Sequence, residues 1–304
     1  MPVGRVIRII GGFYYIMNNQ GETIVAVPRG KLKLTGSVLV GDLVDYEMIL
    51  AEQAVIEGIC PRSIVLKRPF VSNVTQVALI FAHKNPDFNY QLIDRFLVML
   101  ETYNLKTLIL FNKSDLIDLE RAEENAEPYR RIGYQAICTS TKTHQGKLQF
   151  LEKLCFEATV LTGPSGVGKS ALINMVAPSF QLKTGAVSEK IGRGRHTTRE
   201  AQLLPLPEGN GFIFDTPGFT QLDLDFLSPR DLADCFIEFA KYKTECHFLG
   251  CLHQQEPACG VKAAVEAGKI YPWRYEHYLM FLDELNELED RKYLRSGRNR
   301  EKRR

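Results

Sequence analysis

The spacing of hydrophobic and polar positions changes twice along the chain. Up to residue 68, apolar and polar residues alternate in short segments rich in valine and isoleucine; these segments are 4–10, 13–17, 22–27 and 43–49. A period of two is typical of half-buried β-strands, and no helical period competes with it here. About five such strands in so short a stretch predict a small OB-like β-barrel over residues 1–68.

Between residues 69 and 240, short apolar segments alternate with helical patterns. The predicted strands are 77–82, 107–111, 135–138, 159–162 and 211–214. Helical periodicity is found between them, for example at 90–103 and 170–176. Buried strands that alternate with helices predict an α/β domain with a mostly parallel sheet that is covered on both faces.

The third stretch, residues 241–304, begins with a cluster of cysteine and histidine residues. Helical patterns follow at 260–267 and 273–293, and the chain ends in a basic tail. From residue 291 to 304 there are eight lysine or arginine residues and one acid, Glu301. Such a run is typical of a solvated tail, and it can also contact nucleic acid.

A phosphate-binding loop is indicated where the chain reads GPSGVGKS, at residues 163–170. The segment follows a predicted strand and precedes a predicted helix, which is the context that a P-loop requires. Glycines allow backbone N–H groups to surround phosphates, Lys169 would reach the β- and γ-phosphates, and the Ser170 hydroxyl would bind Mg²⁺. The residues expected to contact the nucleotide here are Gly163, Pro164, Ser165, Gly166, Val167, Gly168, Lys169, Ser170 and Ala171.

A second phosphate element follows the P-loop. The apolar run 212–214 leads into Asp215-Thr216-Pro217-Gly218. We expect Asp215 to hold the magnesium shell and the Gly218 N–H to contact the γ-phosphate. Taken alone, this segment indicates only a strand followed by a turn. Because it follows a P-loop in the sequence, we interpret it as a phosphate sensor.

Guanine recognition is indicated by Asn112-Lys113-Ser114-Asp115, directly after an apolar strand. The Asp115 carboxylate can accept hydrogen bonds from guanine N1–H and the 2-amino group, both of which adenine lacks. Asn112 fits the O6/N7 side of the base, and the stem of Lys113 can lie on the base. Ser140, in the Thr-Ser-Thr run 139–141 after the next strand, would complete the base pocket.

These motifs stand in an unusual order. The base motif precedes the P-loop, and the phosphate sensor comes last, whereas ordinary GTPases begin with the P-loop. A circular permutation explains this order without changing the site in three dimensions, because the termini of domains often lie close together.

A metal site is indicated by Cys246, Cys251, His253 and Cys259, with the spacing C-x4-C-x-H-x5-C. Three thiolates and an imidazole suit tetrahedral Zn²⁺, and four protein ligands indicate a structural site. His247 is the less favoured ligand because it directly follows Cys246. The alternative is a group of reduced core thiols, which is how we interpret the remaining cysteines, Cys60, Cys138, Cys155 and Cys235.

The composition excludes few functions. Hydrophobic residues make up 45% and charged residues 24%, and the net charge is +2, as in ordinary soluble proteins. The N-terminus lacks the apolar stretch of a signal peptide, and no apolar run approaches the length of about 18–20 residues that spans a bilayer. We therefore expect a cytoplasmic protein without a membrane segment. As a separate expectation, the chain is a monomer.

In the order in which they occur, these motifs resemble one family, the circularly permuted, ribosome small-subunit-dependent GTPases (GTPase A) of bacteria. The resemblance rests on the base motif, the P-loop, GRGRHTTR at 192–199, the phosphate sensor, the Cys/His cluster and the barrel, and it covers nearly the whole chain. It implies a permuted GTPase domain at 69–240, a zinc-binding helical domain at 241–304 and an RNA-binding barrel. It also marks 192–199 as switch I, in which Thr198, or Thr197, closes on Mg²⁺.

The resemblance also bears on the chemistry. Many GTPases orient water with a glutamine directly after the DxxG motif, but this chain has Phe219 there. We predict slow intrinsic hydrolysis, with the orienting group supplied by switch I or by a partner. His196 is the candidate within the chain, beside Thr198 and Lys169; alternatively, His196 contacts only solvent or a phosphate of the partner.

The implied partner is the small (30S) ribosomal subunit with its 16S rRNA, during late assembly, with subunit-stimulated hydrolysis of GTP to GDP and phosphate. Basic and aromatic residues of the barrel could bind RNA, about half of them being buried instead: Arg5, Arg8, Phe13, Tyr14, Tyr15, Arg29, Lys31 and Lys33. Two other functions stay open. One is a nucleotide kinase or ATPase, and the other is an RNA-binding adaptor that binds nucleotide without turnover.

Overall fold

The computed structural model spans all 304 residues and describes residues 1–30, 37–50, 52–67, 69–180, 201–207, 211–216 and 223–301. The chain divides into two compact units. We call the first the sheet unit; it contains Met1–Phe88, Leu105–Pro128 and Tyr134–Thr220. We call the second the helical unit; it contains Asn89–Asn104, Tyr129–Gly133 and Gln221–Arg304.

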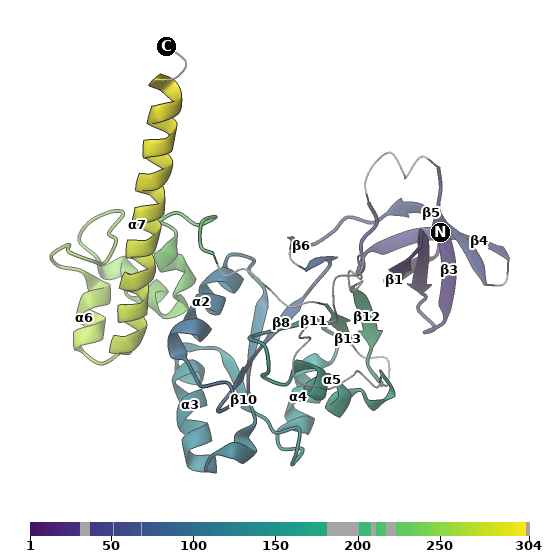
Figure 1. The fold of residues 1–304 in the computed structure, drawn as a ribbon, viewed down its shortest axis with the longest axis horizontal. Coiled ribbons are helices and arrows are strands. Elements are labelled where there is room, and N and C mark those ends of the chain that lie inside the picture. Colours follow the sequence, from purple (N-terminus) through teal and green to yellow (C-terminus); the bar gives the residue numbers. More distant parts are fainter. Residues whose placement is uncertain are drawn as a thin grey trace, which may run out of the picture. The chain divides into compact units, whose positions relative to one another are not determined.

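The N-terminal strands of the sheet unit form a closed barrel (Figure 1). They are β1 (Val3–Ile10), β2 (Phe13–Met17), β3 (Thr23–Pro28), β4 (Leu43–Leu50) and β5 (Gln53–Ile59). Their order is β1-β2-β3-β5-β4, and β4 pairs back onto β1, which closes the ring. Alternate residues point inward and form a core around Val6, Ile16 and Ile56. The barrel that the alternation predicts is confirmed, with each predicted strand within one residue of its observed start and end.

The remainder of the sheet unit is built on parallel strands. Their order is β10-β9-β8-β11-β13, and all four neighbouring pairs are parallel. The strands are β8 (Gln76–Ala82), β9 (Lys106–Asn112), β10 (Gln135–Cys138), β11 (Ala158–Thr162) and β13 (Phe212–Asp215). Every residue of β8 is buried, which explains why its sequence is continuously apolar from Val77 to Ala82 instead of alternating. The α/β prediction is confirmed.

Helices cover this sheet and connect its strands. They are α3 (Leu119–Ile132), α4 (Lys147–Leu154) and α5 (Lys169–Val176). Side chains of α4 and α5, among them Phe150 and Leu172, share one core with the strands. Because the strands are parallel, the segments that follow them all open at the same edge of the sheet.

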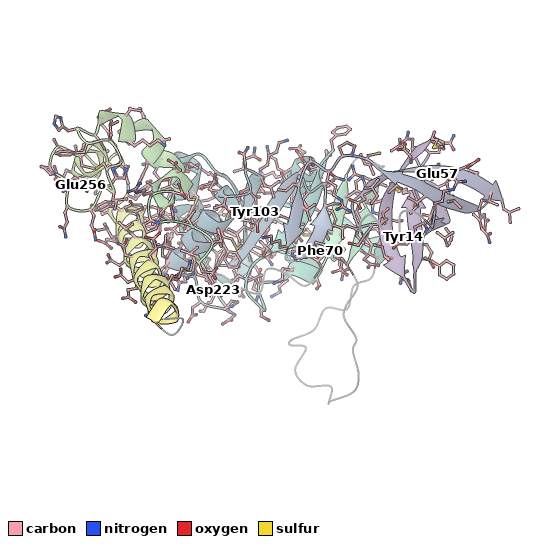
Figure 2. All side chains as sticks on the ribbon, turned by 90° about the horizontal axis from the view of Figure 1, so that it is seen from above. Tyr14, Glu57, Phe70, Tyr103, Asp223 and Glu256 are labelled. Carbon is pink, nitrogen blue, oxygen red and sulfur yellow. The ribbon has the colours of Figure 1, made fainter. Side chains whose placement is uncertain are left out.

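Strand β12 (Gln202–Pro205) connects this sheet with the barrel. It pairs antiparallel with β13 over four residue pairs and with β1 at Arg8. The sequence pattern did not indicate this strand, nor the short hairpin of β6 (Val65–Lys67) and β7 (Phe70–Ser72) that follows the barrel. Phe70 of this hairpin is labelled in Figure 2.

The helical unit packs around aromatic residues. Its elements are α2 (Tyr90–Glu101), the 3-10 helices η4 (Leu232–Cys235), η5 (Ile237–Lys241) and η6 (Lys243–Glu245), and the helices α6 (Gly260–Glu266) and α7 (Pro272–Glu301), which ends near the C-terminus (Figure 1). Its core contains Phe236, Phe239 and Phe281. None of the helices in the described ranges combines the length and the apolar composition that a bilayer crossing requires.

A buried ion network lies inside the helical unit. Arg274 is fully buried and pairs with Asp94 at 2.7 Å and with Glu238 at 2.7 Å. Asp94 also accepts a hydrogen bond from the Tyr129 hydroxyl at 3.1 Å and lies 2.6 Å from Nδ1 of His277. Charges so deeply buried require close partners, so this network ties α2 and the end of α3 to α7.

Candidate nucleotide site and metal centre

The glycine-rich segment 163–170 lies between β11 and the first turn of α5. Gly163 has φ +140°, and a Cβ there would lie 2.0 Å from the carbonyl oxygen of Ile80 on β8. Gly168 has φ +100°, and a Cβ there would lie 2.4 Å from Nδ2 of Asn112. Only glycine allows the loop to approach the neighbouring strand and the base motif this closely.

Lys169 is the first residue of α5, and its ammonium group points back into the loop. It donates to the carbonyl oxygens of Gly163 at 2.8 Å and of Pro164 at 2.6 Å. Burial lowers the pKa of this lysine. Phosphate oxygens in the loop would be stronger acceptors than these neutral carbonyls, because both partners would then be charged.

Asn112, the last residue of β9, holds the base motif against the P-loop. Its side chain is fully buried, and Nδ2 donates to the carbonyl oxygen of Val167 at 2.8 Å. Its Oδ1 accepts from the Thr139 hydroxyl at 3.2 Å. Both polar ends of Asn112 therefore bind protein groups. The side chain joins three segments that are far apart in the sequence.

Lys113 adds a second tie between the base motif and the P-loop. It has φ +61°, and its ammonium group donates to the carbonyl oxygen of Gly166 at 2.7 Å and to that of Asn85. The extended stem of Lys113 thus runs between the P-loop and the segment that follows β8. These hydrogen bonds of Lys113 hold the base motif and the P-loop at a fixed distance from each other.

Asp115 is exposed, and its carboxylate is oriented by the segment after β10. Its Oδ1 accepts from the Ser140 hydroxyl at 2.6 Å, and that hydroxyl oxygen in turn accepts from the backbone N–H of Thr143 at 3.2 Å. Ser114 is buried, with its hydroxyl 3.1 Å from the carbonyl oxygen of Thr139. The structure therefore brings Asn112, Lys113, Asp115, Ser140 and the P-loop together at one edge of the sheet.

His83, directly after β8, supports the base motif, and no sequence motif indicated this role. Its backbone N–H donates to the carbonyl oxygen of Asn112 at 3.0 Å, and its ring stacks on Phe111 with centroids 5.7 Å apart. Nδ1 lies 3.0 Å from the side-chain nitrogen of Asn125. Burial lowers the pKa of His83 to about 4, although the charge of Glu123 acts in the opposite direction. A lone histidine after an apolar strand carries no signal for this supporting position.

The phosphate sensor begins beside the P-loop. Asp215 is the last residue of β13, and β13 runs parallel to β11, with Phe214 paired to Val160. Within the described residues, the buried hydroxyls of Thr162 and Thr216 have no hydrogen-bond partner. Hydroxyl and carboxylate oxygens are ligands that Mg²⁺ prefers, and the Ser170 hydroxyl is carried by the first turn of α5.

Several predicted residues lie outside the described ranges. These are Gly218 of the sensor, Phe219, and the switch residues His196, Thr197 and Thr198. Their predicted roles stay predictions.

The Cys/His cluster is assembled in the helical unit. The ligand atoms of Cys246, Cys251, His253 and Cys259 all lie within 4.8 Å of one another. Nδ1 of His253 is 3.3 Å from Sγ of Cys259 and 3.5 Å from Sγ of Cys246, and the two sulfur atoms are 3.8 Å apart. A tetrahedron with metal–ligand bonds of about 2.0–2.3 Å has edges of about 3.3–3.8 Å, so these distances fit Zn²⁺. His247 is not part of the cluster.

Crowding of the thiols also favours a cation. Burial and the neighbouring Cys259 and Cys246 raise the pKa of Cys251 to about 12, although a backbone hydrogen bond acts in the opposite direction. Three sulfur atoms in this space cannot all be thiolates unless a positive ion neutralises them. Together with the geometry, the donor set supports a metal site.

The backbone of this metal-binding loop is held by groups outside the cluster. The hydroxyl of Tyr275 donates to the carbonyl oxygen of His253 at 2.6 Å, and that of Tyr278 donates to the carbonyl oxygen of Leu252 at 2.6 Å. The carboxylate of Glu256, labelled in Figure 2, accepts from the backbone N–H groups of Leu252 at 2.6 Å and Gln254 at 3.0 Å. Such contacts orient metal ligands and reduce their freedom before binding.

The other cysteines differ from one another. Cys138 and Cys235 are buried, as predicted, and Cys60 is half-buried. The prediction is wrong for Cys155, which is exposed. Cys155 is the C-cap of α4, where the chain turns outward, and the next residue, Phe156, is 83% exposed.

The barrel presents some of the expected RNA-binding side chains. Phe13 and Arg8 are exposed, and the Arg8 guanidinium lies over the half-buried ring of Tyr15. Tyr14, labelled in Figure 2, is half-buried. Arg29 pairs with Glu57, also labelled there. Lys31 and Lys33 lie outside the described residues.

Comparison with known proteins agrees with this geometry. The profile of the family described as RsgA GTPase matches residues 59–225, and that of the RsgA N-terminal domain matches residues 3–56. The chain is 42% identical over 297 residues to the small ribosomal subunit biogenesis GTPase RsgA of Geobacillus thermodenitrificans, covering 96% of this chain and 100% of that protein. It is 43% identical over 283 residues to the RsgA of Moorella thermoacetica, covering 93% and 97%.

Two crystal structures have the same fold over nearly their whole length. YloQ, described as a circularly permuted GTPase, has 33% sequence identity and a TM-score of 0.80, covering 94% of this chain and 96% of that one. YjeQ from Thermotoga maritima has 36% identity and a TM-score of 0.81, covering 93% and 98%.

Proposed function

The chain belongs to the RsgA family of circularly permuted GTPases, and from this we propose that it binds the small (30S) ribosomal subunit late in assembly and hydrolyses GTP to GDP and phosphate with subunit-stimulated turnover. The resemblance seen in the sequence is thereby confirmed at the level of the family. The alternatives of a kinase, an ATPase or a non-hydrolysing adaptor are less well supported.

One observation carries the guanine-nucleotide proposal. Asn112 donates to Val167, and Lys113 donates to Gly166, so that the base motif and the P-loop form one rigid surface although their order in the chain is reversed. Asp115, oriented by Ser140, would then face a base whose phosphates lie in the loop. Such preorganised acceptors select guanine because adenine cannot satisfy them.

The remaining site residues are proposed to bind the phosphates and Mg²⁺. Backbone N–H groups of 163–171 surround the phosphates, and Lys169 binds the β- and γ-phosphates. Ser170 and Asp215, with Thr198, would hold Mg²⁺, which when bound supplies charge neutralisation on the phosphates. Gly218 would contact the γ-phosphate through its backbone.

Hydrolysis is proposed to be slow without the partner. Phe219 cannot orient water, and His196 of switch I is our candidate for that task when the subunit is bound. If the His196→Ala variant keeps its nucleotide affinity and shows unchanged subunit-stimulated turnover, this role is excluded.

The partner surfaces are proposed to be distributed over the chain. The barrel at 1–68 would contact 16S rRNA through cations and aromatic rings; the exposure of Arg8 and Phe13 supports this part of the proposal. The helical domain at 241–304, with one structural Zn²⁺ and a basic tail, would make further contacts, and the GTPase domain would occupy 69–240. We propose a cytoplasmic monomer.

The decisive experiment is phosphate release from GTP, with and without purified 30S subunits, with ATP as the control. We expect stimulation with GTP and none with ATP. Equal binding and turnover of ATP would favour the kinase or ATPase function. No phosphate release at saturating subunits would favour the adaptor.

A further inference from the structure

Strand β13, which ends in Asp215, has different neighbours on its two faces. Because side chains alternate along a strand, Phe212 and Phe214 point to one face, and Ile213 and Asp215 point to the other. Ile213 lies in the core cluster that includes Leu172 of the helix following the P-loop. The face that carries Asp215 is therefore the one covered by the helix that follows the P-loop.

The opposite face of β13 contacts the barrel. The guanidinium of Arg5, on β1, lies over the ring of Phe212 at 5.2 Å from its centroid. Gly41, in the turn before β4, has φ +98°, and a Cβ there would lie 3.0 Å from the ring of Phe214 and 2.1 Å from the carbonyl oxygen of Ser72. Arg5 is half-buried, and this burial lowers its pKa; a cation–π contact is stronger when the charge is partly removed from water.

Backbone pairing also connects β1 of the barrel, through β12, to β13. Arg8 of β1 pairs with Gln202 of β12, and Gln202 pairs with Asp215 of β13. The turn is tied to β1 as well, because the Gly41 N–H donates to the carbonyl oxygen of Val6 at 2.8 Å. One row of paired backbone positions thus runs from the exposed Arg8 of the barrel through Gln202 to Asp215.

We propose that Arg5 is a positioning residue for the GTPase site: ribosomal RNA bound on the barrel fixes β1, and the contact of Arg5 with Phe212 holds Asp215 in the place from which it binds the magnesium of GTP. This inference rests on the proposed function and specifies how the same site is regulated. It differs from a purely structural role of Arg5 because it predicts an effect on magnesium dependence and on stimulated turnover at saturating partner.

The test uses the full-length protein with Arg5→Met, which keeps an unbranched apolar side chain and removes the charge. Arg5→Lys retains a cation for the Phe212 ring and serves as the rescue variant. Arg121→Met, at an exposed position of α3, is the matched control. We measure kcat and KM for GTP at saturating 30S subunits, subunit affinity, and binding of a non-hydrolysable GTP analogue as a function of Mg²⁺ concentration.

For Arg5→Met we expect stimulated kcat to fall about fivefold, and the Mg²⁺ needed for half-maximal analogue binding to rise by a similar factor. GDP affinity without Mg²⁺ and subunit affinity should stay within about twofold of the unmodified protein, and Arg5→Lys should restore most of the loss. Unchanged kcat and unchanged Mg²⁺ dependence would overturn the proposal. So would a loss of subunit affinity with normal kcat at saturation, since Arg5 would then be only an RNA contact.

If Arg5→Met does not fold, Phe212→Leu removes the aromatic partner and keeps an apolar side chain. The same pair of effects is expected, and normal values overturn the proposal equally. Should subunits fail to stimulate even the unmodified protein, the proposed function fails. The Mg²⁺ dependence of analogue binding, measured without subunits, then still tests whether the contact of Arg5 with Phe212 positions Asp215.

Discussion

The nucleotide site and the Cys/His cluster are held together in different ways. The first gathers residues from the ends of β8, β9, β10, β11 and β13, and tertiary hydrogen bonds such as Asn112 to Val167 join them. The second lies on one continuous segment, 246–259, made mainly of loops between short 3-10 and α-helical turns. A buried sheet supports the first site, whereas the second is a short loop segment that packs against the aromatic core of the helical unit.

The two sites are therefore ordered by different interactions, the first by packing of the sheet and the second by metal binding. Sheet packing preorganises the nucleotide loops, so removing one side chain there should change affinity or rate and leave the fold intact. In a short metal-binding segment, the free energy of metal binding is also folding free energy. Each of the following predictions tests one side of the comparison.

The largest effect is expected from metal removal. The Cys251→Ser variant should lose about one zinc per chain, and the helical unit should lose stability, since structural zinc contributes on the order of 10 kcal/mol of apparent binding free energy. GTP affinity should change little because the nucleotide loops lie on the sheet. Metal analysis and calorimetry check this, with His247→Ala as the control that keeps its zinc. Full zinc retention in Cys251→Ser would end the assignment.

Next in size is Lys169→Ala. Removal of the ammonium group that faces the phosphates should reduce GTP hydrolysis about a thousandfold, or about 4 kcal/mol of transition-state stabilisation. The melting temperature should stay within a few degrees, because the neighbouring loop is held by other contacts. Lys153→Ala, at an exposed position of α4, is the control. A variant with near-normal turnover would show that the P-loop is not the catalytic site.

Asp115→Asn should lower GTP affinity about 100-fold, close to 3 kcal/mol, and should improve binding of xanthosine triphosphate. The introduced amide can donate to the xanthine oxygen that replaces the amino group of guanine. Competition binding with both nucleotides measures this, with Asp118→Asn as the matched acid. Equal loss for both nucleotides would mean that Asp115 does not read the base.

The smallest effect concerns pH and His83. Its pKa in the folded state is about 4, below the ordinary value of 6.5, so the unfolded chain binds the proton more strongly. The stability contribution of neutral His83 is complete above pH 6.5 and decreases as the pH falls toward 4. At pH 5 the loss is about 2 kcal/mol.

The His83→Phe variant keeps a ring for stacking on Phe111 and cannot titrate. Its free energy of unfolding, measured by denaturant titration at several pH values, should fall less steeply than that of the unmodified chain between pH 6.5 and 5. Parallel curves for the two proteins would show that His83 is not a buried neutral base.

Much of the fold and several features of the site could be predicted from the sequence because their signals are local. Alternation identified the barrel strands, and the continuous apolar run of β8 identified a strand that is buried on both faces. The Cys/His cluster was predictable because its spacing within one short segment limits how far apart the ligands can lie.

Other features could not be predicted because they depend on contacts between distant residues. The hydrogen bonds of Asn112 to Val167 and Thr139 join segments that are distant in the sequence, and no local pattern indicates them. The supporting position of His83 also has no local signature. Cys155 was expected in the core from its apolar neighbours, whereas the end of α4 places it in solvent.

Most of the elements, the motifs, their permuted order and the family could be predicted from the sequence, because hydrophobic period and residue spacing are properties of neighbouring positions. Strands β6, β7 and β12, the contact of Arg5 with Phe212 and the row of Arg8, Gln202 and Asp215 became evident only in the folded chain. Strands that are distant in the sequence pair only when twist, register and side-chain packing are all satisfied at once. No short segment of sequence contains that information.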